Sequence, residues 1–254
     1  MSYRNDRLEL LSLTSREERG YVNSYRRRRS VALELVQEIA PPGAAVLDVG
    51  AAQGNFTLAL AELGYDVTWN DLRAELADYV RLKHEYGAVR YRPGEIFQLS
   101  QSEQYDVVLA TEIIEHVAHP DQFLKKIAEF AKPHGFLVLT TPNGAYFRNR
   151  LPRFSECGDP STFEAHQFDP DADGHIFLLD PDELEVLADT ARLELVQLRV
   201  FSTFLTHGWL GTRRLVSYLP EAFVRTVDRF VERSPAPIRK KVATDLAVVL
   251  QRNG

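Results

Sequence analysis

From Ala44 onward, short runs of β-branched and other apolar residues alternate with amphipathic stretches. Five runs have this character: AAVLDVG, YDVTWND, AVRYRP, YDVVLAT and GFLVLTT. Between them lie stretches such as NFTLALAEL, RAELADYVRLKHEY and HPDQFLKKIAEFAK, which have the apolar spacing of helices. Strands that alternate with helices in this way are typical of a parallel sheet covered by helices. The sequence therefore predicts an α/β fold.

The rest of the chain extends this prediction to a single domain. A chain of 254 residues can close one substantial core without being divided. We expect two further strands, at 193–204 and 244–252, and a long ordered loop after Thr141 that is rich in Pro, Gly, Asp and aromatic residues. The predicted parts of the domain 1–254 are an N-terminal helical cover over the carboxyl edge of the sheet (1–40), the core (44–204 and 242–252) and a helical insertion near the substrate site (205–241).

Composition narrows the class of protein. The chain is 44% hydrophobic and 26% charged, and it has no long uncharged apolar stretch of the kind that spans a membrane. Its first twenty residues are charged throughout and lack the apolar run of a secretory signal, and its single cysteine, Cys157, has no partner for an internal disulfide. These features predict a cytoplasmic protein without a membrane span.

The charge distribution has one local exception. A net charge of −6 argues against a general nucleic-acid binder, which needs clustered cations to neutralise phosphates. Nevertheless, four consecutive arginines, 26–29, precede the apolar helical pattern VALELVQEIA. Such a run either forms a solvated helix face or contributes to a functional site, and both interpretations stay open.

A glycine-rich turn follows the first predicted strand. Gly50, Ala52 and Gly54 alternate after Asp48, and a helix is predicted to start near Asn55. Small residues allow a ligand close to the backbone, and a helix N-terminus offers it unpaired N–H groups, so the turn suits a nucleotide-like ligand. The alternative is a tight strand-to-helix turn without a ligand.

The second predicted strand ends at an acid, Asp71, which favours the ligand interpretation. A carboxylate at this position can accept hydrogen bonds from both hydroxyls of a ribose, as acids do in dinucleotide-binding folds. A nicotinamide-dependent dehydrogenase would be expected to have G-x-G-x-x-G, whereas the spacing here is G-x-A-x-G. A dehydrogenase is therefore only a minor alternative.

Three chemically active side chains follow the fourth predicted strand, in ATEIIEHVAHP. If this segment is helical, Glu112, Glu115 and His116 lie at positions i, i+3 and i+4 and project from one face. The three side chains would then form either a hydrogen-bonded acid/base cluster or part of the ligand set of a divalent cation. In a third interpretation, Glu112 points to solvent and His116 only packs or caps.

Together, these motifs resemble those of class I S-adenosylmethionine-dependent methyltransferases. The resemblance covers most of 44–252 and rests on Asp48-x-Gly50-x-Ala52-x-Gly54, Asp71, Gly94-Glu95-Ile96 and YDVVLATEIIEHV. It implies a Rossmann-like, mostly parallel sheet of seven strands flanked by helices, with S-adenosylmethionine as cofactor. The family usually has glycine where this chain has Ala52, which places a methyl group near the cofactor.

The resemblance also assigns cofactor contacts. The turn from Gly50 to Gly54 would lie against the methionine part, Asp71 would bind the ribose, and Glu95 with Ile96 would contact the adenine. N-terminal residues often close the site in this family, so Tyr21, Tyr25 or one of the four arginines would meet the cofactor carboxylate. The predicted cofactor-binding residues are Asp48, Gly50, Ala51, Ala52, Gly54, Asp71, Leu72, Glu95, Ile96, Thr111, Tyr25 and Arg27.

A narrower resemblance concerns metal binding. Glu112-x-x-Glu115-His116, followed by Gly174-His175-Ile176-Phe177 and an acidic helix start at 180–184, is similar to two groups of metal-assisted O-methyltransferases. One group methylates catechol rings in ubiquinone synthesis, and the other methylates the terminal ribose 2′-hydroxyl of small RNAs. The resemblance implies that Glu112, Glu115, His116 and His175 bind Mg²⁺ or a similar ion. His166 competes for the fourth position, or acts as a general base, or is only a loop histidine.

The chemistry of methyl transfer agrees with these assignments. The sulfonium methyl is already activated, so the enzyme must hold the nucleophile in line and remove its proton. A hydroxyl bound to a metal loses its proton near neutral pH, much as metal-bound water does. We therefore predict catalytic roles for His116 and Glu115, with His166 as a further candidate.

The predicted activity is O-methylation of a small molecule or glycan, assisted by a divalent cation. Thr111-Glu112-Ile113-Ile114 stands where methyltransferases of base nitrogens or glutamine amides carry an acidic or Asn residue followed by Pro-Pro and an aromatic residue. The alternatives are an RNA 3′-terminal ribose 2′-O-methyltransferase and a non-catalytic S-adenosylmethionine-binding protein. The loop 144–174 and the insertion 205–241 carry no motif that identifies the acceptor, and the oligomeric state is not indicated.

Overall fold

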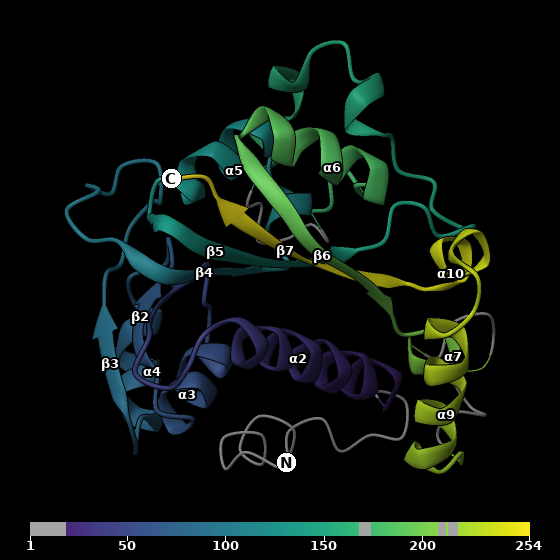
Figure 1. Ribbon diagram of the computed structural model, residues 1–254, viewed down its shortest axis with the longest axis horizontal. Coiled ribbons are helices and arrows are strands. Elements are labelled where there is room, and N and C mark those ends of the chain that lie inside the picture. Colours follow the sequence, from purple (N-terminus) through teal and green to yellow (C-terminus); the bar gives the residue numbers. More distant parts are fainter. Residues whose placement is uncertain (1–18, 168–173, 208–211, 213–217) are drawn as a thin grey trace.

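A computed structural model describes residues 19–167, 174–207, 212 and 218–254. It contains one seven-stranded sheet with the strand order β3-β2-β1-β4-β5-β7-β6 (Figure 1). The strands β1 to β5 run parallel to one another, and β7 runs antiparallel between β5 and β6. The strands are β1 Ala45–Val49, β2 Asp66–Asn70, β3 Ala88–Tyr91, β4 Tyr105–Thr111, β5 Ala131–Pro142, β6 Leu193–Phe201 and β7 Asp245–Arg252. The predicted seven-stranded, mostly parallel sheet is confirmed.

Helices cover both faces of this sheet. In Figure 1, α5 and α6 lie above it, and α2 and α3 lie below it, while α7, α9 and α10 form a group beside the end of β6. The helices are α2 Arg19–Ile39, α3 Asn55–Glu62, α4 Leu76–Lys83, α5 Pro120–Ala128, α6 Pro181–Thr190, α7 Phe204–His207, α9 Glu221–Glu232 and α10 Ala236–Val242. None of the described helices combines the length and the apolar character needed to cross a membrane.

Two apolar layers hold the helices to the sheet, and the alternation of side chains along each strand produces them. Leu47 and Val49 of β1 belong to the layer that includes Phe123 of α5. Val46 points the other way, into the layer that includes Leu35 of α2. Strands that are buried on both faces are therefore rich in apolar residues on both faces, which explains why the sequence pattern could identify them.

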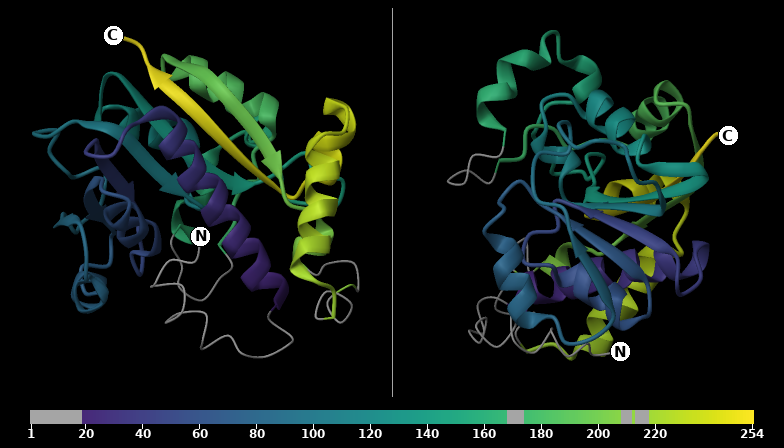
Figure 2. Two further views of the ribbon diagram at one scale, coloured as in Figure 1. Left: turned by 60° about the horizontal axis from the view of Figure 1, so that its bottom comes forward. Right: turned by 90° about the vertical axis from the view of Figure 1, so that its left-hand side faces the viewer.

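The N-terminal cover begins in the described chain with α2, and residues 1–18 of the predicted cover lie outside the described part. The second half of α2 packs against the sheet through fully buried side chains such as Val31 and Leu35. The first half, which carries the four arginines, extends toward α7 and α9 (Figure 2). The predicted cover therefore lies partly across a face of the sheet and only in part at its carboxyl edge.

Several boundaries differ from the sequence prediction. The fifth strand begins at Ala131, because α5 ends at Ala128 and the chain turns at once into the sheet. The sixth strand ends at Phe201, and α7 begins where the strand was predicted to continue. The loop after β5 contains two short 3₁₀ helices, Phe154–Glu156 and Pro160–His166.

Candidate functional site

The glycine-rich turn lies at the carboxyl end of β1, and its backbone requires small residues. Gly50, Ala52 and Gly54 all have positive φ angles, of 60°, 44° and 74°. A Cβ atom on Gly50 would lie 2.2 Å from Cδ1 of Ile113, and a Cβ on Gly54 would lie 2.6 Å from Cγ1 of Val80. Both glycines are thus required by conformation and by space.

Ala52 occupies its left-handed conformation because two bonds fasten it to the second strand. Its backbone N–H donates to Oδ2 of Asp71 at 2.8 Å. Its carbonyl accepts a hydrogen bond from Nε1 of the buried Trp69 at 3.0 Å. These contacts compensate the strain of a non-glycine residue at positive φ, and they join the turn to the tip of β2.

Asp71 is almost fully buried at the tip of β2. Its Oδ1 accepts hydrogen bonds from the backbone N–H of Arg73 at 2.9 Å and from Nε of the same arginine at 3.0 Å. The Arg73 side chain is 56% exposed, so its guanidinium can move into solvent. A ribose bound by Asp71 would share this carboxylate with the Ala52 amide and displace the guanidinium of Arg73.

The predicted adenine segment is fastened to the same strand tip. The backbone N–H of Gly94 donates to the carbonyl of Asp71 at 2.9 Å, and Nδ2 of Asn70 donates to the carbonyl of Gly94 at 2.9 Å. Ile96 is buried, whereas Leu72 is 54% exposed. The segment is therefore placed beside the predicted ribose contact, as an adenine site requires.

Asp48 lies beneath the turn, where solvent does not reach it. Its Oδ2 accepts a hydrogen bond from Oγ1 of Thr57 at 2.6 Å, and its Oδ1 has no hydrogen-bond partner. Burial raises the pKa of the Asp48 carboxyl from 3.8 to about 7, although the Thr57 hydrogen bonds oppose the shift. The structure therefore places Asp48 as a support between the turn and α3, and a direct cofactor contact stays a prediction.

The predicted N-terminal contacts lie in different places. The ring of Tyr25 packs edge-on against Phe56 of α3, with 6.5 Å between ring centroids, so it is close to the helix that follows the turn. Arg27 instead points toward α9, where its Nη2 lies 2.5 Å from Oε1 of Glu232. The structure places Tyr25 beside α3, the helix that follows the predicted cofactor turn, whereas Arg27 lies against α9. The side chain of Tyr21 lies outside the described part.

The segment after β4 is not the helix on which the predicted clustering depended. Glu112 has a φ of 54°, and only Ile114–His116 form a 3₁₀ turn. The Glu112 N–H donates to the carbonyl of Thr140 at 2.8 Å, which continues the pairing of β4 with β5 beyond the strand end. The prediction that Glu112, Glu115 and His116 share one helical face is therefore wrong.

The Glu112 side chain forms its own contacts. Its Oε2 accepts a hydrogen bond from Nη1 of Arg28, and its Oε1 accepts one from Oγ1 of Thr140 at 3.0 Å. Burial raises the pKa of Glu112, and the charge of Arg28 opposes this rise. Arg28, one of the four consecutive arginines, thus compensates a carboxylate at the candidate site.

Glu115 is fully buried and only partly hydrogen-bonded. Its Oε2 accepts from Oγ1 of Thr141 at 2.9 Å, but its Oε1 has no partner. Burial raises the pKa of Glu115 well above its usual value, and the nearby Glu112 carboxylate raises it further. An unpaired carboxylate oxygen in such a place is costly unless a proton or a cation occupies it.

Two histidines lie beside this carboxylate. The rings of His116 and His175 have centroids 4.7 Å apart. Potential ligand atoms of Glu115, His116 and His175 all lie within 4.8 Å of one another. The backbone N–H of Ile176 donates to the carbonyl of Glu115 at 2.7 Å, which holds His175 against the β4 segment.

One carboxylate and two imidazoles form a donor set that suits a divalent cation, and the unpaired Glu115 oxygen is what such an ion would satisfy. The structure brings three of the four predicted ligands together and leaves Glu112 outside this group. His166 is exposed at the end of its 3₁₀ turn and is not part of the group either. Thr111 lies at the end of β4, beside Glu112, and is half-buried.

A buried polar network behind Glu112 was not predicted. His207 Nε2 lies 2.8 Å from Oδ2 of Asp245 and 3.3 Å from Oγ of Ser24. Burial alone would raise the pKa of Asp245, but His207 and Arg28 outweigh it, so the pKa lies below its usual value. These partners are 38 to 183 residues apart in the chain, and no local motif signals them.

A cavity of about 420 Å³ lies at the end of β5. Two arginines, Arg148 and Arg150, and the aromatic ring of Tyr146 contribute to its wall. Leu178, three residues after His175, also lines it, and so does Thr244, the neighbour of Asp245. This cavity therefore belongs to the same end of the sheet as the candidate metal ligands.

Comparison with known proteins agrees with this geometry. Residues 23–198 match the model of a methyltransferase domain family. A ubiquinone biosynthesis O-methyltransferase of Xanthomonas campestris is 32% identical over 188 residues, which cover 72% of this chain and 75% of that protein. The corresponding protein of Bordetella avium is 38% identical over 120 residues, or 44% of this chain, and this alignment spans only 48% of the relative.

Solved structures share the fold at low sequence identity. A structure described as a complex between the Haloferax volcanii Trm112 methyltransferase activator and a putative methyltransferase matches with a TM-score of 0.60 at 15% identity, covering 100% of this chain and 98% of the other. Magnesium protoporphyrin IX methyltransferase of Synechocystis, solved with bound SAH, matches with a TM-score of 0.56 at 14% identity, covering 91% and 84%. The family model, the relatives and the fold together show that this chain belongs to the class I S-adenosylmethionine-dependent methyltransferases.

Proposed function

We propose that this methyltransferase transfers a methyl group to a hydroxyl oxygen of a small molecule or glycan, with a divalent cation at Glu115, His116 and His175. The observation that carries the proposal is the unpaired, fully buried Glu115 oxygen beside two histidines. The ubiquinone biosynthesis O-methyltransferases among the relatives support oxygen as the acceptor atom. We keep cytoplasmic location and a single functional domain as further predictions.

In this proposal, the cofactor occupies the turn between β1 and α3. Backbone N–H groups at the start of α3 face the methionine part of the cofactor. Asp71 accepts hydrogen bonds from the ribose hydroxyls after the guanidinium of Arg73 moves away. In an open α/β sheet such as this one, ligands bind at the carboxyl ends of the strands where the order reverses, here between β1 and β4. The methyl group would thus face the segment that begins at Thr111.

The residues after β4 would help to remove the proton from the hydroxyl that receives the methyl group. A divalent cation, when bound, lowers the pKa of a hydroxyl that contacts it. Glu115 and the two histidines would hold the cation at that position. The loop 144–174 and the insertion 205–241 would shape the rest of the acceptor site.

The proposal is tested by separating metal binding from cofactor binding. We expect Glu115→Gln and His175→Ala to weaken Mg²⁺ binding about tenfold or more in calorimetry. Both variants should keep the affinity for S-adenosylmethionine, because their side chains lie outside the cofactor turn. Methyl transfer to a catechol probe, 3,4-dihydroxybenzoate, should require Mg²⁺ and stop in the presence of a chelator.

A matched control is His134→Ala, at the amino-terminal part of β5 and far from the site. This variant should bind Mg²⁺ like the unmodified protein. Full transfer activity in chelator, or unchanged Mg²⁺ binding in both site variants, would contradict the metal proposal. A loss of transfer in His166→Ala without a loss of metal would identify His166 as a base. Transfer to 3′-terminal RNA but not to small hydroxyl compounds would favour the RNA alternative.

A further inference from the structure

Thr140 and Thr141 are neighbours on β5, and each donates a hydrogen bond to one of the two glutamates that follow β4. Oγ1 of Thr140 donates to Oε1 of Glu112 at 3.0 Å, and Oγ1 of Thr141 donates to Oε2 of Glu115 at 2.9 Å. Both threonines are paired in register with β7, so this part of β5 is regular. Side chains of consecutive residues in a strand point to opposite faces of the sheet. Glu112 and Glu115 are therefore held at opposite faces.

The residues opposite these threonines identify the two faces. On β7, Leu246 pairs with Thr141 and belongs to the apolar layer that contains side chains of α5 and α6. Ala247 pairs with Thr140 and belongs to the layer that contains side chains of α2. Directly paired residues of neighbouring strands share a face of the sheet. Glu115 therefore lies on the side of α5 and α6, whereas the other glutamate lies on the side of α2.

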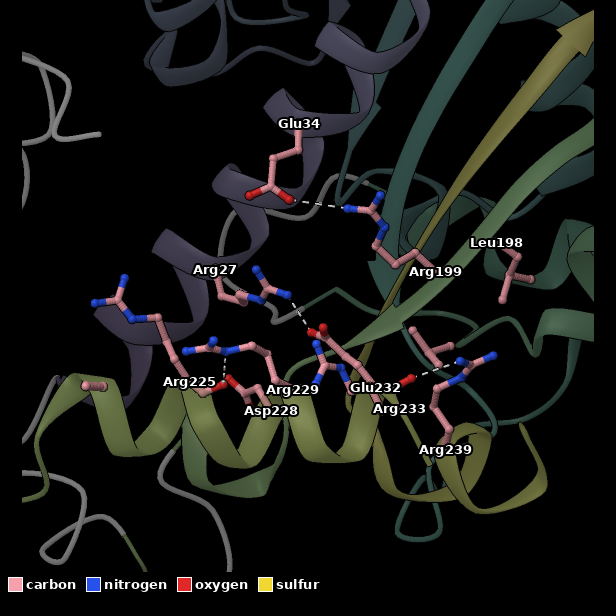
Figure 3. A pocket seen from close by; sticks show the side chains of 12 residues that line it. Arg27, Glu34, Leu198, Arg199, Arg225, Asp228, Arg229, Glu232, Arg233 and Arg239 are labelled. Atoms are coloured by element: carbon pink, nitrogen blue, oxygen red, sulfur yellow. Dashed lines mark hydrogen bonds and ion pairs between the residues drawn. The ribbon is translucent and has the colours of Figure 1, made fainter. Parts of the chain in front are cut away.

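On the α2 side, Glu112 already has a cation beside it. Nη1 of Arg28 donates a hydrogen bond to its Oε2, and the side chains of both residues are only about one-fifth exposed. Arg27, the preceding residue of α2, instead faces α9, where it pairs with Glu232 (Figure 3). Arg28 thus neutralises Glu112 on the opposite side of β5 from Glu115. This arrangement keeps Glu112 away from an ion that Glu115 would bind.

The donor group on the side of α5 and α6 contains two nitrogen ligands. Among the residues that the structure describes, it consists of the Glu115 carboxylate and the imidazoles of His116 and His175, with ligand atoms within 4.8 Å of one another. Glu115 is buried, His116 is half-buried and His175 is exposed, so the group reaches the surface at His175. Imidazole nitrogen is a preferred donor for zinc, iron and other first-row transition metals, whereas Mg²⁺ prefers oxygen donors.

Building on the metal site of the proposed function, we propose that Glu115, His116 and His175 bind a first-row transition-metal ion in preference to Mg²⁺, without Glu112. One carboxylate and two imidazoles are the protein ligands of many catalytic zinc and non-haem iron sites, which leave further positions open. Glu115 would contribute its buried Oε1, which accepts no hydrogen bond from the described residues. The two imidazoles would give the site its preference, because they are present whatever oxygen ligands complete it.

Calorimetry with the full chain, freed of metal by a chelator, tests this preference. We expect Zn²⁺ and Co²⁺ to bind with affinities about 100-fold or more above that of Mg²⁺, because imidazole favours these ions. His175 is exposed, so His175→Ala should fold normally, and it should weaken Zn²⁺ binding more than Mg²⁺ binding. The visible absorption of bound Co²⁺ depends on its ligands, and the spectrum should change in both His116→Ala and His175→Ala.

The two glutamates provide the matched comparison. Glu115→Gln should weaken Zn²⁺ binding about tenfold or more, because a charged ligand is lost. Arg28→Gln/Glu112→Gln removes a neutral pair on the other face, so Zn²⁺ affinity should stay within about twofold. His134→Ala, at an exposed histidine of β5, should also bind Zn²⁺ normally.

The possible outcomes separate this inference from the proposed function. Mg²⁺ binding as tight as Zn²⁺ binding, or no saturable Zn²⁺ binding, would overturn the preference for a transition metal. Zn²⁺ binding that survives both Glu115→Gln and His175→Ala, or that is lost in Arg28→Gln/Glu112→Gln, would overturn the ligand set. Zn²⁺ bound at this site without methyl transfer to any hydroxyl compound would instead contradict the proposed function and leave the inference standing.

Discussion

The carboxyl edge of the sheet contains two regions that are built in different ways. At the ends of β1, β2 and β3, the turn 50–54, Asp71 and the segment 94–96 are held by backbone contacts and by side chains close to each strand end. At the ends of β4 and β5, the polar groups depend on partners from α2, α7 and β7. The contacts of the first region come from residues close to the ends of neighbouring strands. The contacts of the second region join residues that are far apart in the sequence.

This difference separates two kinds of ligand site. The first region presents backbone groups and the carboxylates of Asp71 and Glu95, so it suits a ligand that all family members share. The second region contains the buried carboxyl groups of Glu112 and Glu115. The charge of Arg28 lowers the pKa of both groups, and the Glu112 carboxylate raises the pKa of Glu115. A substitution at a residue distant in the sequence, such as Arg28, can therefore change the pKa values in the second region without changing the cofactor turn.

The largest expected effect concerns the first region. Asp71→Ala removes the proposed acceptor of both ribose hydroxyls and also the acceptor of the Ala52 N–H. Two charged hydrogen bonds of roughly 1.5–3 kcal/mol each correspond to a loss of S-adenosylmethionine affinity of about 100-fold or more. Calorimetry with the purified variant measures this loss.

Arg73→Gln is the matched control for Asp71→Ala. Because Arg73 competes for the same carboxylate, its replacement should leave the cofactor affinity unchanged or increase it slightly. Unchanged affinity in Asp71→Ala would contradict the ribose assignment. A strong loss in Arg73→Gln would mean that the arginine, not the carboxylate, contacts the cofactor.

The sequence predicted most of the fold and most of the first region. All seven strands were located. The inner strands are mostly buried and rich in apolar residues, whereas the edge strands β3 and β6 are only partly buried. The positions of Gly50, Gly54 and Asp71 follow directly from where those strands end. Most errors in the predicted fold concerned boundaries, such as the early start of β5 at Ala131.

The second region was predicted only in part. Three of the four predicted metal ligands, Glu115, His116 and His175, lie close together, and their role as ligands stays a prediction. The helical geometry used to connect Glu112 with Glu115 and His116 was wrong, since Glu112 has a positive φ. The ion pair of Arg28 with Glu112 joins residues 84 positions apart. Contacts of this length leave no periodic pattern, so sequence spacing could not reveal them.

An intermediate effect tests whether this long-range pair supports the second region. Arg28→Gln removes the cation that compensates Glu112, and the side chains of both residues are only about one-fifth exposed. Removing one partner of a pair that is mostly buried should lower the free energy of unfolding by about 2–3 kcal/mol. Urea denaturation near neutral pH measures this change.

The double variant Arg28→Gln/Glu112→Gln provides the control. Removing both charges should recover most of the lost stability, since no uncompensated carboxylate then stays buried. Equal destabilisation in the single and double variants would show that Arg28 stabilises the fold by packing rather than by its charge. Either result leaves the cofactor turn unaffected, which calorimetry with S-adenosylmethionine can verify.

The smallest expected effect returns to the first region and concerns Asp48. Because burial raises its pKa from 3.8 to about 7, this carboxyl group stabilises the fold fully below its unfolded pKa, and its contribution is lost as the pH rises through the folded value. Stability should therefore fall by up to about 1.4 kcal/mol per pH unit between about pH 4 and about pH 7 from this group.

Asp48→Asn should remove this pH dependence, because an amide can still accept from Thr57 but does not ionise. Relative to the unmodified protein, the variant should gain about 1 kcal/mol or more in its free energy of unfolding when the pH is raised from about 5.5 to about 7. Denaturation curves at the two pH values measure the difference. An equal change in both proteins would mean that the Asp48 carboxyl has the same pKa in the folded and the unfolded protein, which would contradict the prediction.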